Sequence, residues 1–268
     1  MIDFQNVSFS YGEESSGGGI RNVNLTINTG EFVLLTGESG CGKTTITRLV
    51  NGLVPHYYEG NLEGDVLLDG KSVSDTPLYD LAAMVGSVFQ NPKSQFFNVD
   101  TDSELAFACE NLGYPQEDIL KRIDRTVSDY HIEDLMGRSV FALSGGEKQK
   151  IACASSSVLL PGIMVLDEPS SNLDMAAIDD LRQVLSLWKK QGKTILIAEH
   201  RLYYLHDLAD RMLYVKDGEI EREYTPAEFD SLSDGTRKEM GLRPFSLSKL
   251  KPANQYQAHT AKQMEFQN

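Results

Sequence analysis

The chain is best understood from residues 37–44, which read Gly37-Glu38-Ser39-Gly40-Cys41-Gly42-Lys43-Thr44. This stretch follows an apolar run at 32–35 and precedes an apolar-periodic segment at 46–50, so it is predicted to join a strand to a helix. The three glycines let successive backbone N–H groups turn inward, where they and the positive end of the helix can bind phosphate oxygens. Glycine, lysine and threonine at this spacing therefore predict a phosphate-binding loop rather than an ordinary glycine-rich turn.

Within the loop, the Lys43 ammonium would reach the β- and γ-phosphates of a nucleotide, and the Thr44 hydroxyl would bind Mg²⁺. Cys41 is expected to be a small spacer; a second hypothesis is that alkylating its thiol blocks nucleotide binding by bulk. We assign the whole loop and the next residue to ATP binding: Gly37, Glu38, Ser39, Gly40, Cys41, Gly42, Lys43, Thr44 and Thr45.

Composition limits the classes of function. The 268 residues carry a net charge of −14, which disfavours binding to nucleic acid because its phosphates would repel the chain. No apolar run approaches the ~20 residues of a membrane span, and no secretory signal is expected at the start. The three cysteines lack metal-site spacing and suit a reducing compartment. These features predict a cytosolic chain.

Hydrophobic patterning predicts an α/β fold. Alternating residues indicate strands at 2–11, 21–27 and 64–68. The continuous apolar run at 163–166 indicates a central parallel strand, and 84–89 and 194–198 are predicted to be further buried strands. Helical spacing is found in the remaining segments, which are 101–135, 148–159, a helix ending at 192, 202–209 and 226–240. Asp102 is expected to cap the first helix of 101–135, and Pro115 to occupy the first position of the second.

Polar residues follow three of the buried runs, at what would be the carboxyl edge of a parallel sheet, where ligands bind. Asp167 and Glu168 follow 163–166, Gln90 follows 84–89, and His200 follows 194–198. Asp167 is expected to hold Mg²⁺, and Glu168 to polarise the attacking water as general base. The alternative for the two acids is a solvated cap at the end of the strand.

A second motif is Leu143-Ser144-Gly145-Gly146-Glu147. Ser144 with Glu147 three residues later predicts a capping box at a helix start. Two glycines in a first helical turn lower its stability, so close approach of another backbone or a ligand is expected there.

The order of these motifs resembles that of ATP-binding-cassette ATPases over about residues 1–225. The resemblance implies that Gln90 touches Mg²⁺ and the attacking water, and that His200 contacts the γ-phosphate and orients Glu168. It also implies that Asp174 links opposing sites across a dimer and that Tyr11 stacks on adenine. Without the resemblance, Gln90 would be a surface amide, His200 a structural residue and Tyr11 a packing aromatic.

The resemblance also implies an architecture. It is a P-loop NTPase fold of the cassette type, with a central, mostly parallel sheet, an antiparallel β subdomain and an all-helical subdomain inserted at about 91–160. The expected domains are a nucleotide-binding domain at 1–225, a small helical extension at 226–245 and a polar, flexible tail at 246–268.

In this family, Ser144, Gly145, Gly146 and the residue at 147 bind the γ-phosphate held by a second subunit, so the implied active unit is a head-to-tail dimer that closes on two ATP molecules. The family's usual residue at 147 is glutamine, and Glu147 departs from it in a way that bears on this contact. We expect Ser144 to cap its own helix in the open state and to share its hydroxyl with phosphate in the closed state.

The segments 90–97, 104–107 and 110–113 are similar to the energy-coupling-factor branch, which imports vitamins or cobalt and nickel ions. That branch pairs its ATPases with a transmembrane coupling protein and a membrane substrate-binding protein, so the chain would lie on the inner face of the membrane. Phe96, Phe97 and Phe107 would suit a groove for a coupling helix, or would simply pack in the core. The alternatives are an ATPase of another importer or exporter and a cassette ATPase that moves no solute.

Overall fold

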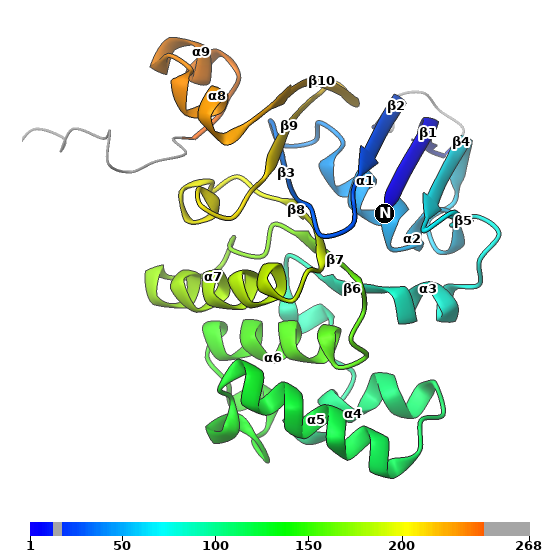
Figure 1. Ribbon diagram of the computed structural model, residues 1–268, viewed down its shortest axis with the longest axis vertical. Coiled ribbons are helices and arrows are strands. Elements are labelled where there is room, and N and C mark those ends of the chain that lie inside the picture. Colours follow the sequence, from blue (N-terminus) through cyan, green and yellow to red (C-terminus); the bar gives the residue numbers. More distant parts are fainter. Residues whose placement is uncertain (13–17, 244–268) are drawn as a thin grey trace, which may run out of the picture.

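The computed structural model describes residues 1–12 and 18–243 (Figure 1). The strands are β1 (Ile2–Tyr11), β2 (Gly19–Ile27), β3 (Phe32–Thr36), β4 (Gly60–Leu68), β5 (Lys71–Ser72), β6 (Val85–Val88), β7 (Ile163–Asp167), β8 (Thr194–Ala198), β9 (Arg211–Lys216) and β10 (Glu219–Tyr224). The α-helices are α1 (Lys43–Val50), α2 (Leu53–His56), α3 (Leu78–Met84), α4 (Thr101–Asn111), α5 (Gln116–Tyr130), α6 (Gly145–Ser157), α7 (Met175–Lys190), α8 (Pro226–Ser231) and α9 (Asp234–Glu239).

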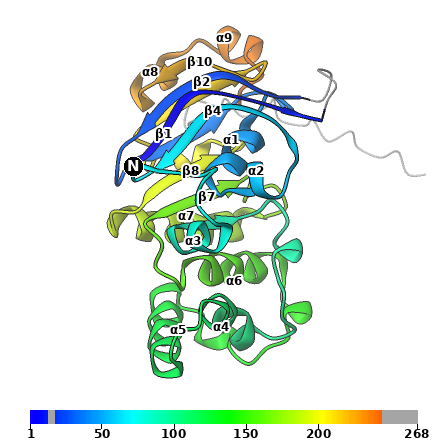
Figure 2. The ribbon, with the colours of Figure 1, turned by 90° about the vertical axis from the view of Figure 1, so that its right-hand side faces the viewer.

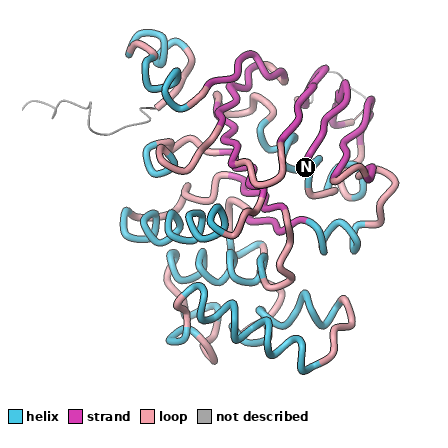
Figure 3. Tube along the Cα trace, viewed as in Figure 1, coloured by secondary structure: helices cyan, strands magenta, loops and turns pink. Residues whose placement is uncertain are grey.

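Two sheets form the body of the molecule, and Figure 3 shows their strands gathered at one end. The first sheet is antiparallel, with order β2-β1-β4-β5, and the second has order β10-β9-β3-β8-β7-β6. In the second sheet β9, β3, β8, β7 and β6 are parallel, and β10 pairs with β9 in the antiparallel sense. The predicted fold class is confirmed.

The central strands β3, β7 and β8 of the larger sheet are buried on both faces, which explains their apolar sequences, whereas the edge strand β10 is mostly exposed. Alternate residues of one strand enter different cores: Leu34 packs with the side chains of α6 and α7, whereas Leu35 packs with α1 and the antiparallel sheet. Neighbouring strands follow the same rule, with Leu166 on the first side and Val165 on the second. The sheet therefore stands between two hydrophobic layers.

Helices α4, α5 and α6 lie together at the end opposite the antiparallel sheet (Figure 2). Helix α6 also contacts α7, which joins these helices to the sheet. Tyr130, at the end of α5, bonds to Ser157 at the end of α6, and the indole N–H of Trp188 in α7 donates to the Tyr130 hydroxyl. All three side chains are buried, and burial holds the pKa of Tyr130 well above its ordinary value, so its hydroxyl stays neutral.

Three local expectations about helices are wrong. Asp100, not Asp102, caps α4, because its backbone is fixed by a bridge to Ser139 and its carboxylate accepts from the Ser103 amide. Pro115 lies one residue before α5 as its N-cap. Segment 202–209 holds only a 3₁₀ turn at Tyr203–Leu205, although its apolar side chains are buried at helical spacing.

The C-terminal helices α8 and α9 follow β10 (Figure 1). The expected tail at 246–268 lies outside the described residues. Within the described residues, none of the helices has the length and apolar character needed to span a bilayer. The three cysteines are free and buried.

Candidate functional site

The phosphate-binding loop connects β3 to α1, and its backbone carbonyl oxygens bind the ammonium group of Lys43 from the same loop. The Lys43 ammonium donates to the carbonyl oxygens of Gly37 at 3.0 Å and Glu38 at 2.8 Å, and lies 3.6 Å from the Cys41 Sγ. Gly37 has φ +148°, and a Cβ there would lie 2.1 Å from the Val215 carbonyl oxygen. A side chain is thus excluded from this turn, as the glycine spacing predicts.

Thr44 and Asp167 meet across the sheet edge, although 123 residues separate them in the chain. The Thr44 hydroxyl donates to Asp167 Oδ1 at 3.1 Å. Burial raises the pKa of Asp167 above its ordinary value, and the Thr44 hydrogen bond acts in the opposite direction. One carboxylate and one hydroxyl oxygen side by side fit Mg²⁺, which prefers few protein oxygens plus phosphate and water.

Glu168 is held between the two other strand-end residues. The Gln90 amide donates to Glu168 Oε2 at 3.1 Å, and His200 Nε2 lies 3.1 Å from Oε1. Glu168 itself has φ +45°, a left-handed conformation that is uncommon for a residue with a side chain and clusters at functional sites. The ends of β6, β7 and β8 therefore bring together Gln90, Glu168 and His200, the three residues predicted to take part in hydrolysis.

Glu199 was not among the predicted site residues, yet it positions this group. Its buried carboxylate accepts from the backbone amides of His200 at 2.8 Å and Arg201 at 3.1 Å. Its other oxygen accepts from the Tyr204 hydroxyl and from the Ser170 amide, two residues after Glu168. The signal for this role is a carboxylate directly before a strand-end histidine, but its partner at Ser170 lies 29 residues away.

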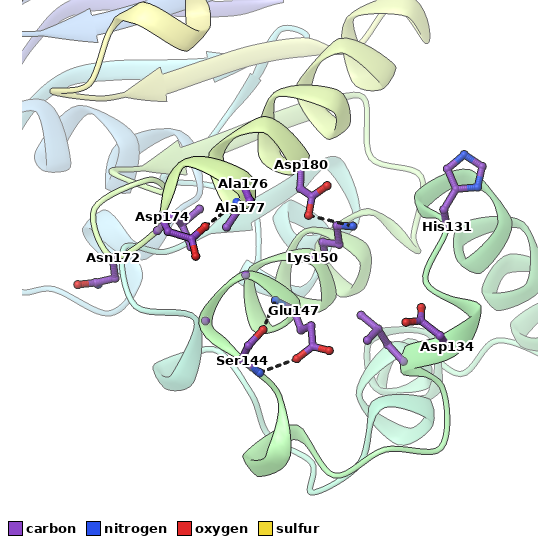
Figure 4. A pocket seen from close by; sticks show the side chains of 14 residues that line it. His131, Asp134, Ser144, Glu147, Lys150, Asn172, Asp174, Ala176, Ala177 and Asp180 are labelled. Carbon is purple, nitrogen blue, oxygen red and sulfur yellow. Dashed lines mark hydrogen bonds and ion pairs between the residues drawn. The ribbon is translucent and has the colours of Figure 1, made fainter.

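The second motif forms the N-terminus of α6 (Figure 4). The predicted capping box is present: the Ser144 hydroxyl accepts from the Glu147 amide at 3.3 Å, and Glu147 Oε2 accepts from the Ser144 amide at 2.6 Å. The backbone hydrogen bond from Ser144 is the main cause that lowers the pKa of Glu147 from 4.5 to about 2, with a smaller contribution from Arg138. Ser144 therefore caps its own helix in this conformation.

The two glycines of this motif differ. A Cβ at Gly146 would lie 2.8 Å from the Ala177 Cβ, whereas a Cβ at Gly145 would have its nearest neighbour at 3.9 Å. Close approach of α7 thus explains why residue 146 is glycine. At Gly145 the first turn of α6 is open, with room for a side chain. Asp174 caps α7 by accepting from the Ala177 amide at 2.9 Å.

These residues line a cavity of about 410 Å³ between α6, α7 and the end of α5. Figure 4 shows Ser144, Glu147, Asp174 and the Lys150–Asp180 ion pair around it. No residue of the phosphate-binding loop lines this cavity. The structure thus brings the predicted residues into two groups, one around Lys43 and Glu168 and one around Ser144.

Tyr11 lies beside the first group. Its hydroxyl is 3.3 Å from Thr45 Oγ1 and accepts from Arg48 at 3.0 Å, while its ring packs edge-on against Phe9. The guanidinium of Arg48 also lies 4.1 Å from the ring centre of Tyr58. The hydroxyl of Tyr11 is therefore tied to α1, and adenine stacking by its ring stays a prediction.

The three phenylalanines predicted to suit a groove do not all lie together. Phe97 is 75% exposed and stacks on Phe107 with ring centres 4.8 Å apart. Phe96 packs against the hydrophobic layer that includes α6 and α7.

Known proteins share this arrangement. Residues 20–171 match the profile of the ABC transporter family. A putative ABC transporter ATP-binding protein of Treponema denticola is 46% identical over 94% of this chain and 51% of its own length. Another, from Pyrococcus abyssi, is 40% identical over 85% of this chain and 81% of its own length. The chain spans about half the length of the first of these relatives.

Solved structures agree. CbiO1 of Clostridium perfringens, part of the ABC transporter complex CbiONQ, superposes with a TM-score of 0.73 at 26% identity, covering 88% of this chain and 94% of that one. The cassette MJ0796, in a dimeric post-hydrolysis state with ADP and Pi, superposes with a TM-score of 0.72 at 26% identity, covering 84% and 99%. The fold that carries the phosphate-binding loop, the strand-end acids and the glycine-rich start of α6 is thus shared with solved ABC cassettes. The chain belongs to the ABC transporter family, and it carries the family's ATPase domain.

Proposed function

We propose that this chain hydrolyses ATP to power a membrane importer. The observation that carries the proposal is the position of Glu168 between Gln90 and His200, one residue after the Asp167–Thr44 pair. A carboxylate held from both sides at a strand end is placed to accept a proton from water, and general bases of this kind contribute roughly 10²–10⁴-fold to a rate.

Phosphoryl transfer depends mainly on positioning and on charge stabilisation. Bound Mg²⁺ would supply charge neutralisation on the β- and γ-phosphates, held by Thr44, Asp167 and Gln90. Lys43 would exchange its two loop carbonyls for phosphate oxygens. His200 would touch the γ-phosphate and keep Glu168 oriented toward the water.

A second ATPase subunit completes the proposed site. Ser144, Gly145 and Gly146 present an open helix N-terminus, which favours an anion, yet they line a cavity that does not include the phosphate-binding loop of the same chain. The phosphate they would bind therefore belongs to another subunit, with Asp174 at the contact. ATP would hold the two subunits together and hydrolysis would release them, which is a ligand-biased two-state switch.

The energy-coupling-factor branch is the type of importer we favour, with a vitamin or a transition-metal ion as cargo. The similarity to CbiO1, part of the CbiONQ complex, supports this choice. The partners would then be a transmembrane coupling protein and a membrane substrate-binding protein, with this chain peripheral on the cytoplasmic face. The stacked pair of the exposed Phe97 and the half-buried Phe107 is a candidate contact for the coupling protein.

The similarity to MJ0796 favours a second candidate, an ATPase subunit of another kind of ABC transporter. In either case we propose the same organisation, with a nucleotide-binding domain at 1–225 that includes a helical subdomain at about 91–160. The helical extension at 226–245 and the tail at 246–268 would be additions to it.

The test is to weigh the Glu168→Gln chain in solution with and without ATP and Mg²⁺. Blocked hydrolysis should trap the closed state, so the expected result is a monomer that becomes a dimer only with ATP. A chain that binds ATP and stays monomeric would contradict self-pairing and point to a different partner subunit. Lys43→Ala is the control that should abolish both binding and dimerisation, and a Glu168→Gln chain that fails to bind ATP would overturn the proposal as a whole.

A further inference from the structure

The Arg138 side chain lies against the capping box of α6. Arg138 Nη1 donates to Glu147 Oε1 at 2.9 Å, while the other oxygen of the same carboxylate accepts from the Ser144 amide. The two side chains are 39% and 31% exposed, so the pair is partly shielded from water. Both oxygens of Glu147 are therefore engaged, one by Ser144 and one by Arg138.

The backbone of Arg138 is fixed by Thr101, a buried residue of helix α4. The Thr101 amide donates to the Arg138 carbonyl at 3.0 Å, and the Arg138 amide donates to the Thr101 hydroxyl at 3.3 Å. Thr101 is fully buried and is the first residue of α4. Arg138 thus has a rigid base from which its guanidinium can hold Glu147.

The charge on Glu147 poses a problem for the proposed phosphate site. Its carboxylate lies within one hydrogen bond of the Ser144 backbone, and a carboxylate next to a phosphate is repelled by it. A helix N-terminus attracts an anion through a partial charge of roughly +0.5, which one unpaired carboxylate would outweigh. The positive charge of Arg138 offsets the negative charge of Glu147, so the net charge at the helix N-terminus becomes more positive.

We propose that Arg138 is a positioning residue for the nucleotide site between subunits: it fixes and neutralises Glu147, so that the Ser144 end of α6 can face a phosphate. The inference rests on the proposed function. It assigns no contact between Arg138 and the nucleotide, because the guanidinium acts through Glu147.

The first experiment uses the single chain and needs no partner. Hydrogen exchange of the Ser144 and Glu147 amides is followed in the unchanged chain, in Arg138→Met and in Arg138→Lys. Loss of the Arg138–Glu147 hydrogen bond in Arg138→Met should raise the exchange rate of both amides by about threefold to tenfold, because both are exposed when the capping box opens locally. Arg138→Lys should restore part of the protection. Unchanged exchange in Arg138→Met would overturn the positioning role.

The second experiment measures ATP-driven dimerisation in the Glu168→Gln background. Arg138→Met should weaken dimerisation by roughly threefold to tenfold, the range expected for losing a partly exposed charged pair. With Glu147→Gln, which keeps a neutral capping box, the same change at Arg138 should have less than about a twofold effect. Arg182→Met, which removes a comparable ion pair to Asp207 outside the site, is the matched control and should leave dimerisation unchanged.

The outcomes separate this inference from the proposed function. If Arg138→Met weakens dimerisation equally with and without the Glu147→Gln substitution, the inference is overturned, because Arg138 would then act independently of Glu147. A chain that never dimerises contradicts self-pairing, while the exchange measurement still decides the role of Arg138. Melting temperatures of all variants identify a general loss of folding, and rescue of Arg138→Met by Glu147→Gln would exclude that explanation.

Discussion

His200 Nε2 lies 3.1 Å from Oε1 of Glu168, and the Gln90 amide donates to the opposite oxygen at 3.1 Å. The carboxylate is therefore fixed in rotation before any substrate arrives. Since a general base must point at the proton it removes, the proposed hydrolysis should depend on both neighbours.

His200→Ala is expected to lower kcat for ATP hydrolysis by roughly 10²–10³-fold while changing KM much less, because the substitution removes orientation of the base rather than the phosphate-binding loop. Steady-state kinetics measure this effect. His206→Ala is the matched control, since His206 also pairs with a carboxylate, Asp207, but lies outside the site. A His200→Ala chain with activity within about threefold of the unchanged chain would contradict the assignment.

Asp167→Asn should stabilise the nucleotide-free chain and weaken its binding of Mg²⁺-ATP. Burial raises the pKa of Asp167, so at neutral pH its ionised form is less favourable in the folded than in the unfolded state. This cost is absent below the unfolded pKa of 3.8 and grows as pH rises through the raised folded pKa. Asparagine removes it but also removes the metal-binding charge.

Thermal unfolding at neutral pH and at pH 4 measures the gain from Asp167→Asn, which should be larger at neutral pH. Asp75→Asn, at an exposed position, should change stability by no more than about 0.5 kcal/mol. A less stable Asp167→Asn chain at neutral pH would show that the carboxylate does not carry this cost.

Gly146→Ala should destabilise the chain by about 1–3 kcal/mol, because the added methyl would overlap the Ala177 Cβ at 2.8 Å between two helices that are already in contact. Chemical unfolding in urea measures the loss. Gly145→Ala, with 3.9 Å to its nearest neighbour, is the control and should not destabilise the chain. The double variant Gly146→Ala with Ala177→Gly should recover most of the lost stability; no recovery would mean that the overlap is not the cause.

Glu147→Gln should reduce stability at neutral pH and have less effect in acid. The pKa of Glu147 falls from 4.5 to about 2 in the folded chain, chiefly through its hydrogen bond with the Ser144 amide. A lowered pKa means that the ionised group stabilises the fold above pH 4.5 and that this contribution is lost as pH falls toward 2. Urea unfolding at pH 7 and pH 3.5 should show the difference between the two chains shrinking; a constant difference would contradict the ionic contribution.

Much of the site could be predicted because its signals are local. Glycine spacing dictates the turn between β3 and α1, and the strand-end residues Gln90, Asp167 and His200 follow predicted buried strands. Parallel strands end at one edge of the sheet, so Gln90, Asp167 and His200 were expected at that edge once those strands were recognised. The adjacent positions of β8, β7 and β6 in the sheet then make them neighbours. The capping box at Ser144 is likewise a short-range pattern.

The parts that could not be predicted depend on distant contacts. Asp100 and Asp102 are equally good caps in the sequence, and only the bridge from Asp100 to Ser139 selects the first. No sequence pattern pointed to the role proposed for Arg138, because that role depends on its contacts with Thr101 and Glu147, which belong to two other elements. Segment 202–209 has helical spacing, yet its apolar side chains cover the core from a chain that is mostly irregular.

The buried hydroxyl of Tyr130 has a mechanical consequence. It joins the C-terminal ends of α6 and α7 through Ser157 and Trp188, while Ser144 and Asp174 cap the opposite ends of the same two helices. Helices fastened at one end and in contact along their length cannot slide past each other without breaking buried hydrogen bonds. Ser144 and Asp174 should therefore keep a fixed spacing, so that any group that reaches one of them meets the other at a set distance.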